Sequence, residues 1–111
     1  MLYHYIIVYM YSCTDIPAIE TLQSSVTAEF LTDVTIAVDI HGTYPPVYSV
    51  VWTKNRNKSA VVGWKYVGGS VQEPNLIIKS VEATDDGTYT CTIFNGIGYG
   101  SVNVSLLSWR T

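Results

Sequence analysis

The chain has 111 residues, of which 48% are hydrophobic and 14% charged, and its formal net charge is −3. This length fits one ordinary domain with one hydrophobic core, and the apolar fraction excludes a disordered tail. The chain has only 6 lysines and arginines, which excludes a nucleic-acid ligand because phosphate binding needs clustered basic side chains.

The first 14 residues, 1–14, are strongly apolar and rich in tyrosine. A secretory leader has an apolar stretch but also a basic start, which is missing here. Aromatic and β-branched residues equally favour a β-strand. The stretch is too short for a bilayer, which takes about 20 apolar residues, so we predict no membrane insertion by this chain. Two interpretations stay open: a degenerate leader or an extra strand.

Residues 15–111 consist of short alternating segments separated by turn residues, which predicts a single all-β domain. Strands are expected around residues 34–40, 47–52, 76–79, 89–93 and 102–106, with turns at Pro45-Pro46 and Gly68-Gly69. No stretch keeps a helical spacing of apolar residues for three turns. The side chains predicted to face inward are Val34, Ile36, Val38, Ile40, Leu76, Ile78, Tyr89, Cys91, Ile93, Val102, Val104 and Leu106.

The segment from Asp85 to Cys91 reads D-D-G-T-Y-T-C. It matches the D-x-G-x-Y-x-C motif without gaps and therefore resembles the immunoglobulin family. Gly87 permits a tight turn into the strand. In this resemblance, Tyr89 stands where the family's tyrosine corner ties its hydroxyl to the preceding loop, and Trp52 stands where a buried tryptophan packs beside the cysteine.

The segments on either side of the motif indicate a subclass. Residues 76–81, L-I-I-K-S-V, resemble the family's L-x-I-x-x-V approach, and residues 95–98, N-G-I-G, resemble the N-x-x-G turn of intermediate-set (I-set) domains. The stretch from Tyr66 to Ile78 is similar to invertebrate hemicentin-like and molluscan immunoglobulin arrays. The resemblance implies an immunoglobulin-like Greek-key β-sandwich of two antiparallel sheets.

The cysteines depart from the family's pattern. The position of its first cysteine falls on Val38, with Gly42 following at the usual interval. The resemblance therefore implies that the intersheet disulfide is absent and that an aliphatic contact against Cys91 and Trp52 replaces it. Cys13, the other cysteine, could reach Cys91, pair with another chain, stay free or leave with a leader. Two distant cysteines and two histidines do not form a zinc pattern, so we expect no metal and no cofactor.

Catalytic signatures are missing. Asp85 and Asp86 are adjacent carboxylates, but their place in the motif favours a structural role, and we expect Asp86 to pair with Lys65. His4 and His41 lack a nucleophile or carboxylate at a motif spacing. The sequence contains no G-x-S-x-G, P-loop or H-E-x-x-H segment. We therefore expect a protein that is not an enzyme.

Aromatic residues are the strongest indication of binding, since the chain has 9 tyrosines and 3 tryptophans. By analogy with the family, the loops at Tyr44-Pro45-Pro46 and at residues 95–99 should be neighbours at one end, whereas Tyr48, Trp64 and Thr92 suit a sheet face. Any one of these aromatics, Tyr66 included, could instead pack against a neighbouring strand. The candidate binding residues are Tyr44, Tyr48, Trp64, Asn95, Ile97 and Tyr99, and the structural core positions are Val38, Trp52, Leu76, Asp86, Gly87, Tyr89 and Cys91.

Two N-x-S/T triplets make Asn57 and Asn103 glycosylation candidates. Together with the resemblance, they favour a secreted or cell-surface module for recognition or adhesion. Its partner would be a protein or microbial ligand, or a second copy of the chain in a homodimer. The alternative is an intracellular, titin-like structural module in a filament, which the missing cysteine at Val38 fits.

Overall fold

The computed structural model describes residues 15–41, 44–55, 59–61 and 63–110. The N-terminal segment 1–14, with Cys13 and His4, and the glycosylation candidate Asn57 lie outside this part. The described elements are β1 (Ile19–Thr21), β2 (Ser25–Glu29), β3 (Val34–Ile36), β4 (Val38–Ile40), β5 (Ser49–Lys54), β6 (Ser59–Ala60), β7 (Tyr66–Gly68), β8 (Leu76–Ile78), the 3-10 turn η1 (Ala83–Asp85), β9 (Gly87–Phe94) and β10 (Tyr99–Trp109).

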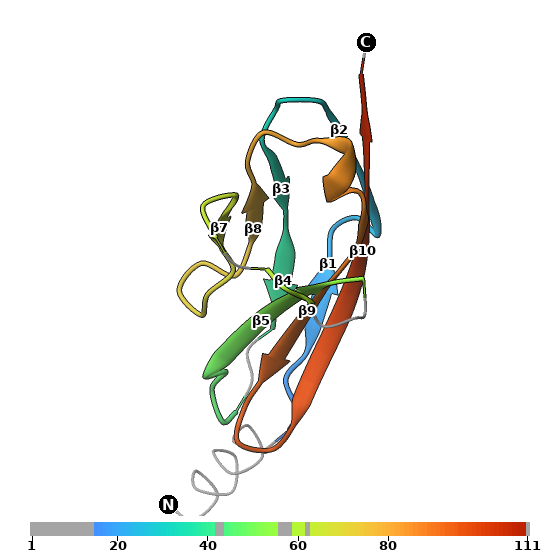
Figure 1. Cartoon of the computed structure of the whole chain (residues 1–111). Helices are drawn as coiled ribbons and strands as arrows, with labels where there is room; N and C mark the ends of the chain where they lie inside the picture. The colour runs from blue at the N-terminus through green and yellow to red at the C-terminus, as the bar shows by residue number, and fades with distance from the viewer. Residues whose placement is uncertain (1–14, 42–43, 56–58, 62, 111) are drawn as a thin grey trace, which may run out of the picture.

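The strands form two layers (Figure 1). One layer is a 5-stranded sheet in the order β2-β10-β9-β5-β6. The other contains β3-β8-β7 and the pair β1-β4. This arrangement confirms the predicted immunoglobulin-like β-sandwich. One pairing differs from the expected antiparallel pattern, because β10 pairs with β2 in parallel.

The strand predicted over residues 34–40 is interrupted at Ala37, between β3 and β4. At this point the backbone N–H of Val38 donates to the side-chain oxygen of Asn75 at 2.9 Å. A side chain thus takes the place of a ladder partner. The interruption allows β4 to pair with β1 while β3 pairs with β8, which joins the two small sheets into one layer.

The core lies between the layers and follows the predicted alternation. In β9 every second side chain is buried, and β8 buries both of its outer positions. Val34, Val38, Ile40 and Val102 are partly buried and pack against this core. The fully or nearly buried apolar side chains are Ala28, Ile36, Trp52, Leu76, Ile78, Val81, Tyr89, Cys91, Ile93, Val104 and Leu106.

Trp52 is fixed in the core by one hydrogen bond and one glycine contact. Its indole Nε1 donates to the carbonyl oxygen of Pro74 at 2.9 Å, which satisfies its polar group. Gly69 has φ +74°, and a Cβ there would lie 2.9 Å from Cδ1 of the indole. The predicted Gly68-Gly69 turn therefore needs glycine at its second position both for the backbone conformation and for space.

Cys91 is a free, buried thiol. Burial raises its pKa to about 12, so the thiol is protonated and unreactive near neutral pH. Val38, at the position of the family's first cysteine, is half-buried and packs against the core to which Cys91 belongs. Its direct contact with Cys91 and Trp52 remains a prediction.

The predicted Asp86–Lys65 pair is wrong, because Lys65 pairs with the neighbouring carboxylate, that of Asp85. Lys65 Nζ lies 2.9 Å from Asp85 Oδ2 and 3.2 Å from Glu82 Oε2. The turn η1 directs the Asp85 side chain inward. The backbone carbonyl oxygen of Asp85 accepts a hydrogen bond from the hydroxyl of Tyr89 at 2.6 Å, which is the expected tyrosine corner. Asp86 instead accepts the backbone N–H of Ser108 at 2.8 Å, which ties the turn to β10.

Candidate binding surface

The end of the sandwich at the β9–β10 turn is organised by Asn95, which is only 3% exposed. Its amide nitrogen donates to the carbonyl oxygens of Asp15 at 2.7 Å and Pro45 at 3.1 Å. Its amide oxygen accepts the backbone N–H groups of Ile97 at 2.9 Å and Gly98 at 3.0 Å. All four hydrogen-bonding positions of the side chain are therefore used inside the protein.

This geometry corrects one prediction and supports another. Asn95 was expected to contact a ligand, but its side chain is buried and has no donor or acceptor left to offer. It is a clamp that positions its neighbours. The expected proximity of the Tyr44–Pro46 loop and the turn at residues 95–99 is observed, because Asn95 binds both segments.

Exposed apolar side chains surround this clamp. Phe94 connects two of them, since its carbonyl oxygen accepts the N–H of Tyr48 at 2.9 Å and its ring centroid lies 6.1 Å from that of Tyr99. We call the exposed set the loop-end surface. It consists of Ile16, Tyr44, Tyr48, Ile97 and Tyr99.

Ile16 was not predicted from the sequence. A Cβ on Gly98 would lie 2.8 Å from Cγ2 of Ile16, so the chain near residue 16 packs closely over the β9–β10 turn. Any side chain at residue 98 would press against Ile16, and the two residues are more than eighty positions apart. The contact is a product of the fold, and the N-x-x-G turn is its one sign in the sequence.

Trp64 does not belong to the loop-end surface. It is 83% exposed and precedes Lys65, whose ammonium group contacts Glu82 and Asp85 beside η1, at the opposite end of β9. Tyr66, another aromatic considered above, packs partly against the core. The six predicted binding residues therefore fall into one buried clamp, four loop-end residues and one isolated tryptophan.

The outward face of β5, β9 and β10 adjoins the loop-end surface. In the strand register Thr92 lies opposite Val51 on one side and Ser101 on the other. Asn103 is exposed on the same face, and its side-chain oxygen accepts the hydroxyl of Thr90 at 2.8 Å. A glycan on this asparagine would thus project from the middle of the sheet.

A small charged cluster lies on the pair β1–β4. Glu20 and Asp39 are directly opposite in register, and His41 Nε2 lies 3.2 Å from Glu20 Oε2 and 3.8 Å from Asp39 Oδ2. The nearer carboxylate, Glu20, comes from another strand, whereas Asp39 stands two residues before His41 in the sequence. All three side chains are exposed, and exposed ion pairs contribute little to stability.

The loop-end surface itself is suited to contact rather than chemistry. Its side chains are aliphatic or aromatic and carry no carboxylate, thiol or imidazole. Exposed aromatic side chains in a cluster are typical of protein interfaces. In the part of the chain that the structure describes, no helix is long and apolar enough to cross a membrane.

Comparison with protein families gives one match that covers most of the chain. The model of the immunoglobulin I-set domain matches residues 17–107. A curated relative, the cell adhesion molecule DSCAML1 of Gallus gallus, is 31% identical over 87 residues. That match covers 75% of this chain but only 4% of the relative, so the chain spans a small fraction of the relative's length.

Solved structures show the same fold at lower identity. The four N-terminal immunoglobulin domains of Dscam1 isoform 4.44 match with a TM-score of 0.73 and 22% identity, covering 89% of this chain and 26% of that one. A chimeric titin Z1Z2 matches with a TM-score of 0.70 and 19% identity, covering 89% and 99%. Dscam1 and a titin thus share this architecture.

Proposed function

Because the chain belongs to the immunoglobulin I-set domain family, we propose that it is an extracellular recognition module of the adhesion type. It binds another protein through the loop-end surface and carries out no catalysis. The observation that carries this proposal is the cluster of exposed apolar side chains around the buried Asn95 clamp. The similarity to a cell adhesion molecule supports it.

The clamp favours recognition because it holds two loops in a defined arrangement before a partner arrives. Preorganised loops lose less conformational entropy on binding than mobile ones. Tyr44, Tyr48 and Tyr99 supply large contact areas with few rotatable bonds. Two binding candidates, Ile97 and Ile16, add aliphatic surface between them.

The proposal includes a location and a range of partners. We place the domain in the secreted space or on the outer face of a cell, as in the invertebrate immunoglobulin arrays that the sequence resembles. A glycan on Asn103 fits this location. The partner is a protein, either of a microbe, of another cell, or a second copy of this chain.

The test compares two variants in a multivalent binding assay. Beads coated with the full chain are scored for aggregation with one another and for capture of fluorescent extracellular proteins and bacterial cells. The triple variant Tyr44→Ser, Ile97→Ser, Tyr99→Ser should lose binding at least tenfold, because aromatic anchors dominate interface energies. The control is Leu22→Ser, which removes an exposed apolar side chain elsewhere on the surface. Equal loss in both variants, or in neither, contradicts the proposal.

A second candidate function is a titin-like intracellular structural module. The free thiol of Cys91 favours it, because buried cysteines stay reduced in the cytosol. Expression of the full coding chain in eukaryotic cells separates the candidates by intact mass, with and without thiol alkylation. Secreted, glycosylated protein without its first dozen or so residues supports recognition. Retained, unglycosylated protein with two free thiols supports the structural module.

A further inference from the structure

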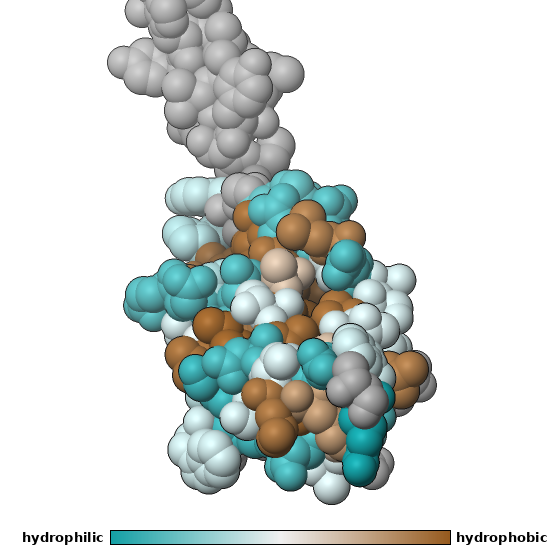
Figure 2. Space-filling model, turned by 90° about the horizontal axis from the view of Figure 1, so that it is seen from above, coloured by the Kyte–Doolittle hydropathy of each residue, from teal (hydrophilic) through white to brown (hydrophobic). Residues whose placement is uncertain are grey.

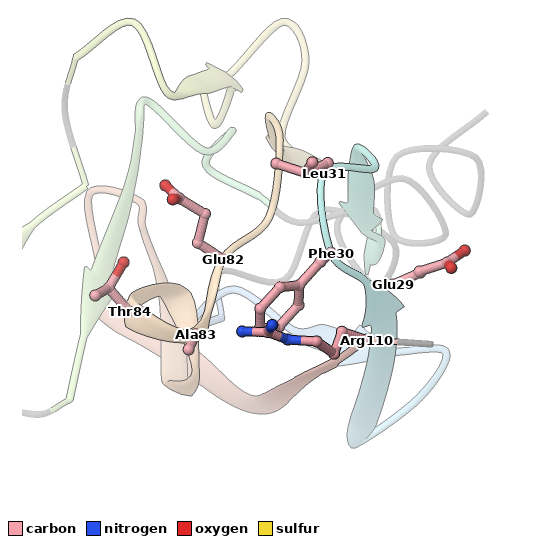
Figure 3. Close-up of a pocket in the computed structure, with 7 residues that line it drawn as sticks. All are labelled: Glu29, Phe30, Leu31, Glu82, Ala83, Thr84 and Arg110. Atoms are coloured by element: carbon pink, nitrogen blue, oxygen red, sulfur yellow. The ribbon is translucent and has the colours of Figure 1, made fainter.

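The end of the molecule opposite the loop-end surface contains a pocket of about 600 Å³, which lies within the usual size range of ligand sites. Phe30 and Leu31 of the β2–β3 connection, Ala83 of η1 and Arg110 after β10 line it (Figure 3). Figure 2 looks onto this end, where apolar and hydrophilic groups are interspersed. The strand β10 runs between the two ends from Tyr99 to Trp109. At a rise of about 3.3 Å per residue, it separates them by about 33 Å.

The walls of this pocket, which we call the Arg110 pocket, are fixed by the backbone. The N–H of Phe30 donates to the carbonyl oxygen of Trp109 at 2.8 Å, and the N–H of Leu31 donates to that of Val81 at 2.8 Å. Leu31 has φ +66° and is 74% exposed. Non-glycine residues seldom adopt this conformation, so the fold holds an apolar side chain outward at the rim.

Arg110 provides the polar group of the pocket. Its guanidinium carbon lies 5.2 Å from the centroid of the Phe30 ring. It makes no hydrogen bond or ion pair with any other residue that the structure describes. A guanidinium group stacked on a ring keeps its planar edge of N–H donors available, and this edge matches a carboxylate in bidentate geometry.

The nearby carboxylates do not occupy this edge. Glu82 extends away from the guanidinium and lies 3.2 Å from Lys65 Nζ, and Glu29 points away on the other side (Figure 3). Because both carry negative charge at the rim, a small free anion gains little there. A ligand needs an apolar group for the pocket in addition to its carboxylate.

We propose that the Arg110 pocket binds a segment of a partner protein in which an aspartate or glutamate stands next to a large apolar residue. The apolar side chain packs against Phe30, Leu31 and Ala83. The carboxylate accepts two N–H groups of Arg110. This site is separate from the loop-end surface, so the two can be tested independently.

The test uses two blocked dipeptides, acetyl-Asp-Phe-amide and acetyl-Asn-Phe-amide, titrated into the labelled full chain and followed by NMR. The aspartyl peptide should shift the Ala83 methyl and the Arg110 Nε–H signals. It should bind about fivefold more tightly than the asparaginyl peptide, since hydrogen bonds to a charged group are about 1 kcal/mol stronger than neutral ones.

Variants of Arg110 make the result specific. Arg110→Gln should reduce binding of the aspartyl peptide to the level of the asparaginyl one, and Arg110→Lys should give an intermediate affinity because it keeps the charge but not the fork. Leu22→Ser is the control, and a thermal melt verifies that each variant is folded. Equal binding of both peptides, an unaffected Arg110→Gln variant, or shifts confined to Tyr44, Ile97 and Tyr99 would overturn the proposal. The last outcome leaves the loop-end proposal standing.

Discussion

The two ends of the sandwich are held together by different chemistry. At the loop end, the neutral amide of Asn95 makes four hydrogen bonds to backbone groups. At the opposite end, the ammonium group of Lys65 contacts two carboxylates beside η1, and Asp86 ties that turn to β10. One end thus relies on neutral dipoles and the other on charges.

This difference matters for where a partner can bind. Charged groups attract counter-ions and depend on salt and pH, whereas neutral hydrogen bonds depend on neither. We therefore expect the loop-end surface to keep its arrangement when salt or pH changes. At the charged end, Lys65 and Lys79 are paired with carboxylates, whereas the guanidinium of Arg110 forms no ion pair with a residue that the structure describes.

The largest expected effect is at the neutral clamp. Asn95→Ala should lower the free energy of unfolding by about 3 kcal/mol, because several buried backbone groups lose their partners at once. Urea denaturation of the parent and the variant at low and high salt measures this loss. The loss should be the same at both salt concentrations.

A matched variant shows whether both the oxygen and the nitrogen of the Asn95 amide contribute to stability. Asn95→Asp keeps acceptors for the N–H groups of Ile97 and Gly98 but cannot donate to Asp15 and Pro45. It should also be destabilised, because a carboxylate then faces two carbonyl oxygens. A loss below about 1 kcal/mol for the alanine variant would mean that the clamp is not the main connection at this end.

The next effect concerns the charged end. Lys65→Met should lower the free energy of unfolding by about 2 kcal/mol, since it leaves the Asp85 carboxylate, only 7% exposed, without its cation. The 16% exposure of the lysine side chain keeps the loss below that of a fully buried pair. Urea denaturation gives the value, and unlike the clamp variant this one should depend on salt.

A double-mutant cycle identifies the cause. If the buried charge is responsible, Lys65→Met with Asp85→Asn should be more stable than Lys65→Met alone, because asparagine can still accept the N–H of Glu82 without a charge. Burial lowers the pKa of Lys65, but its hydrogen bonds to Asp85 and Glu82 outweigh this effect and raise the pKa overall. The contribution of the lysine is therefore present at neutral pH and is lost only as the pH rises through that raised pKa.

Sequence reasoning succeeded where the signal is local. The alternation in Leu76–Ile78 and Val102–Leu106 predicted the buried faces of β8 and β10, because side chains in a strand point to opposite faces in turn. The resemblance of Asp85–Cys91 to the immunoglobulin motif implied the tyrosine corner that Tyr89 forms. Each of these features depends on residues within one segment.

The errors arose where two segments meet. Asp85 and Asp86 are adjacent, and only the direction of η1 decides which one reaches Lys65. Asn95 was assigned to the surface, although an asparagine whose side chain bonds N–H groups two and three residues ahead is a turn former, and the N-x-x-G spacing was the available signal. The Arg110 pocket has no such signal, since distant segments form it, and the position of Ile16 is indicated only by the glycine of the N-x-x-G turn.

The smallest expected effect separates an exposed ion pair from the buried ones. Asp33 accepts the N–H of Ser80 at 2.9 Å, and its carboxylate lies 2.9 Å from Lys79 Nζ. Two contacts hold the pKa of Asp33 below its usual range: the larger effect comes from the hydrogen bond donated by the N–H of Ser80, and the smaller one from Lys79. Asp33→Asn should lower the melting temperature less than Lys65→Met does, because asparagine keeps the Ser80 hydrogen bond and exposed pairs contribute little.

The pH dependence of this variant shows whether the ionised carboxylate of Asp33 stabilises or destabilises the folded protein. A carboxyl group with a lowered pKa in the folded state stabilises the protein above its ordinary pKa, and this stabilisation is lost as the pH falls through the lowered value. The melting temperatures of the parent and Asp33→Asn should therefore differ at pH 7 and converge as the pH falls below the ordinary aspartate pKa of about 4. High salt at pH 7 should shrink the same difference. A difference that grows in acid would mean that the charged end is stabilised by the neutral form of Asp33, and the contrast between the two ends would then fail at this residue.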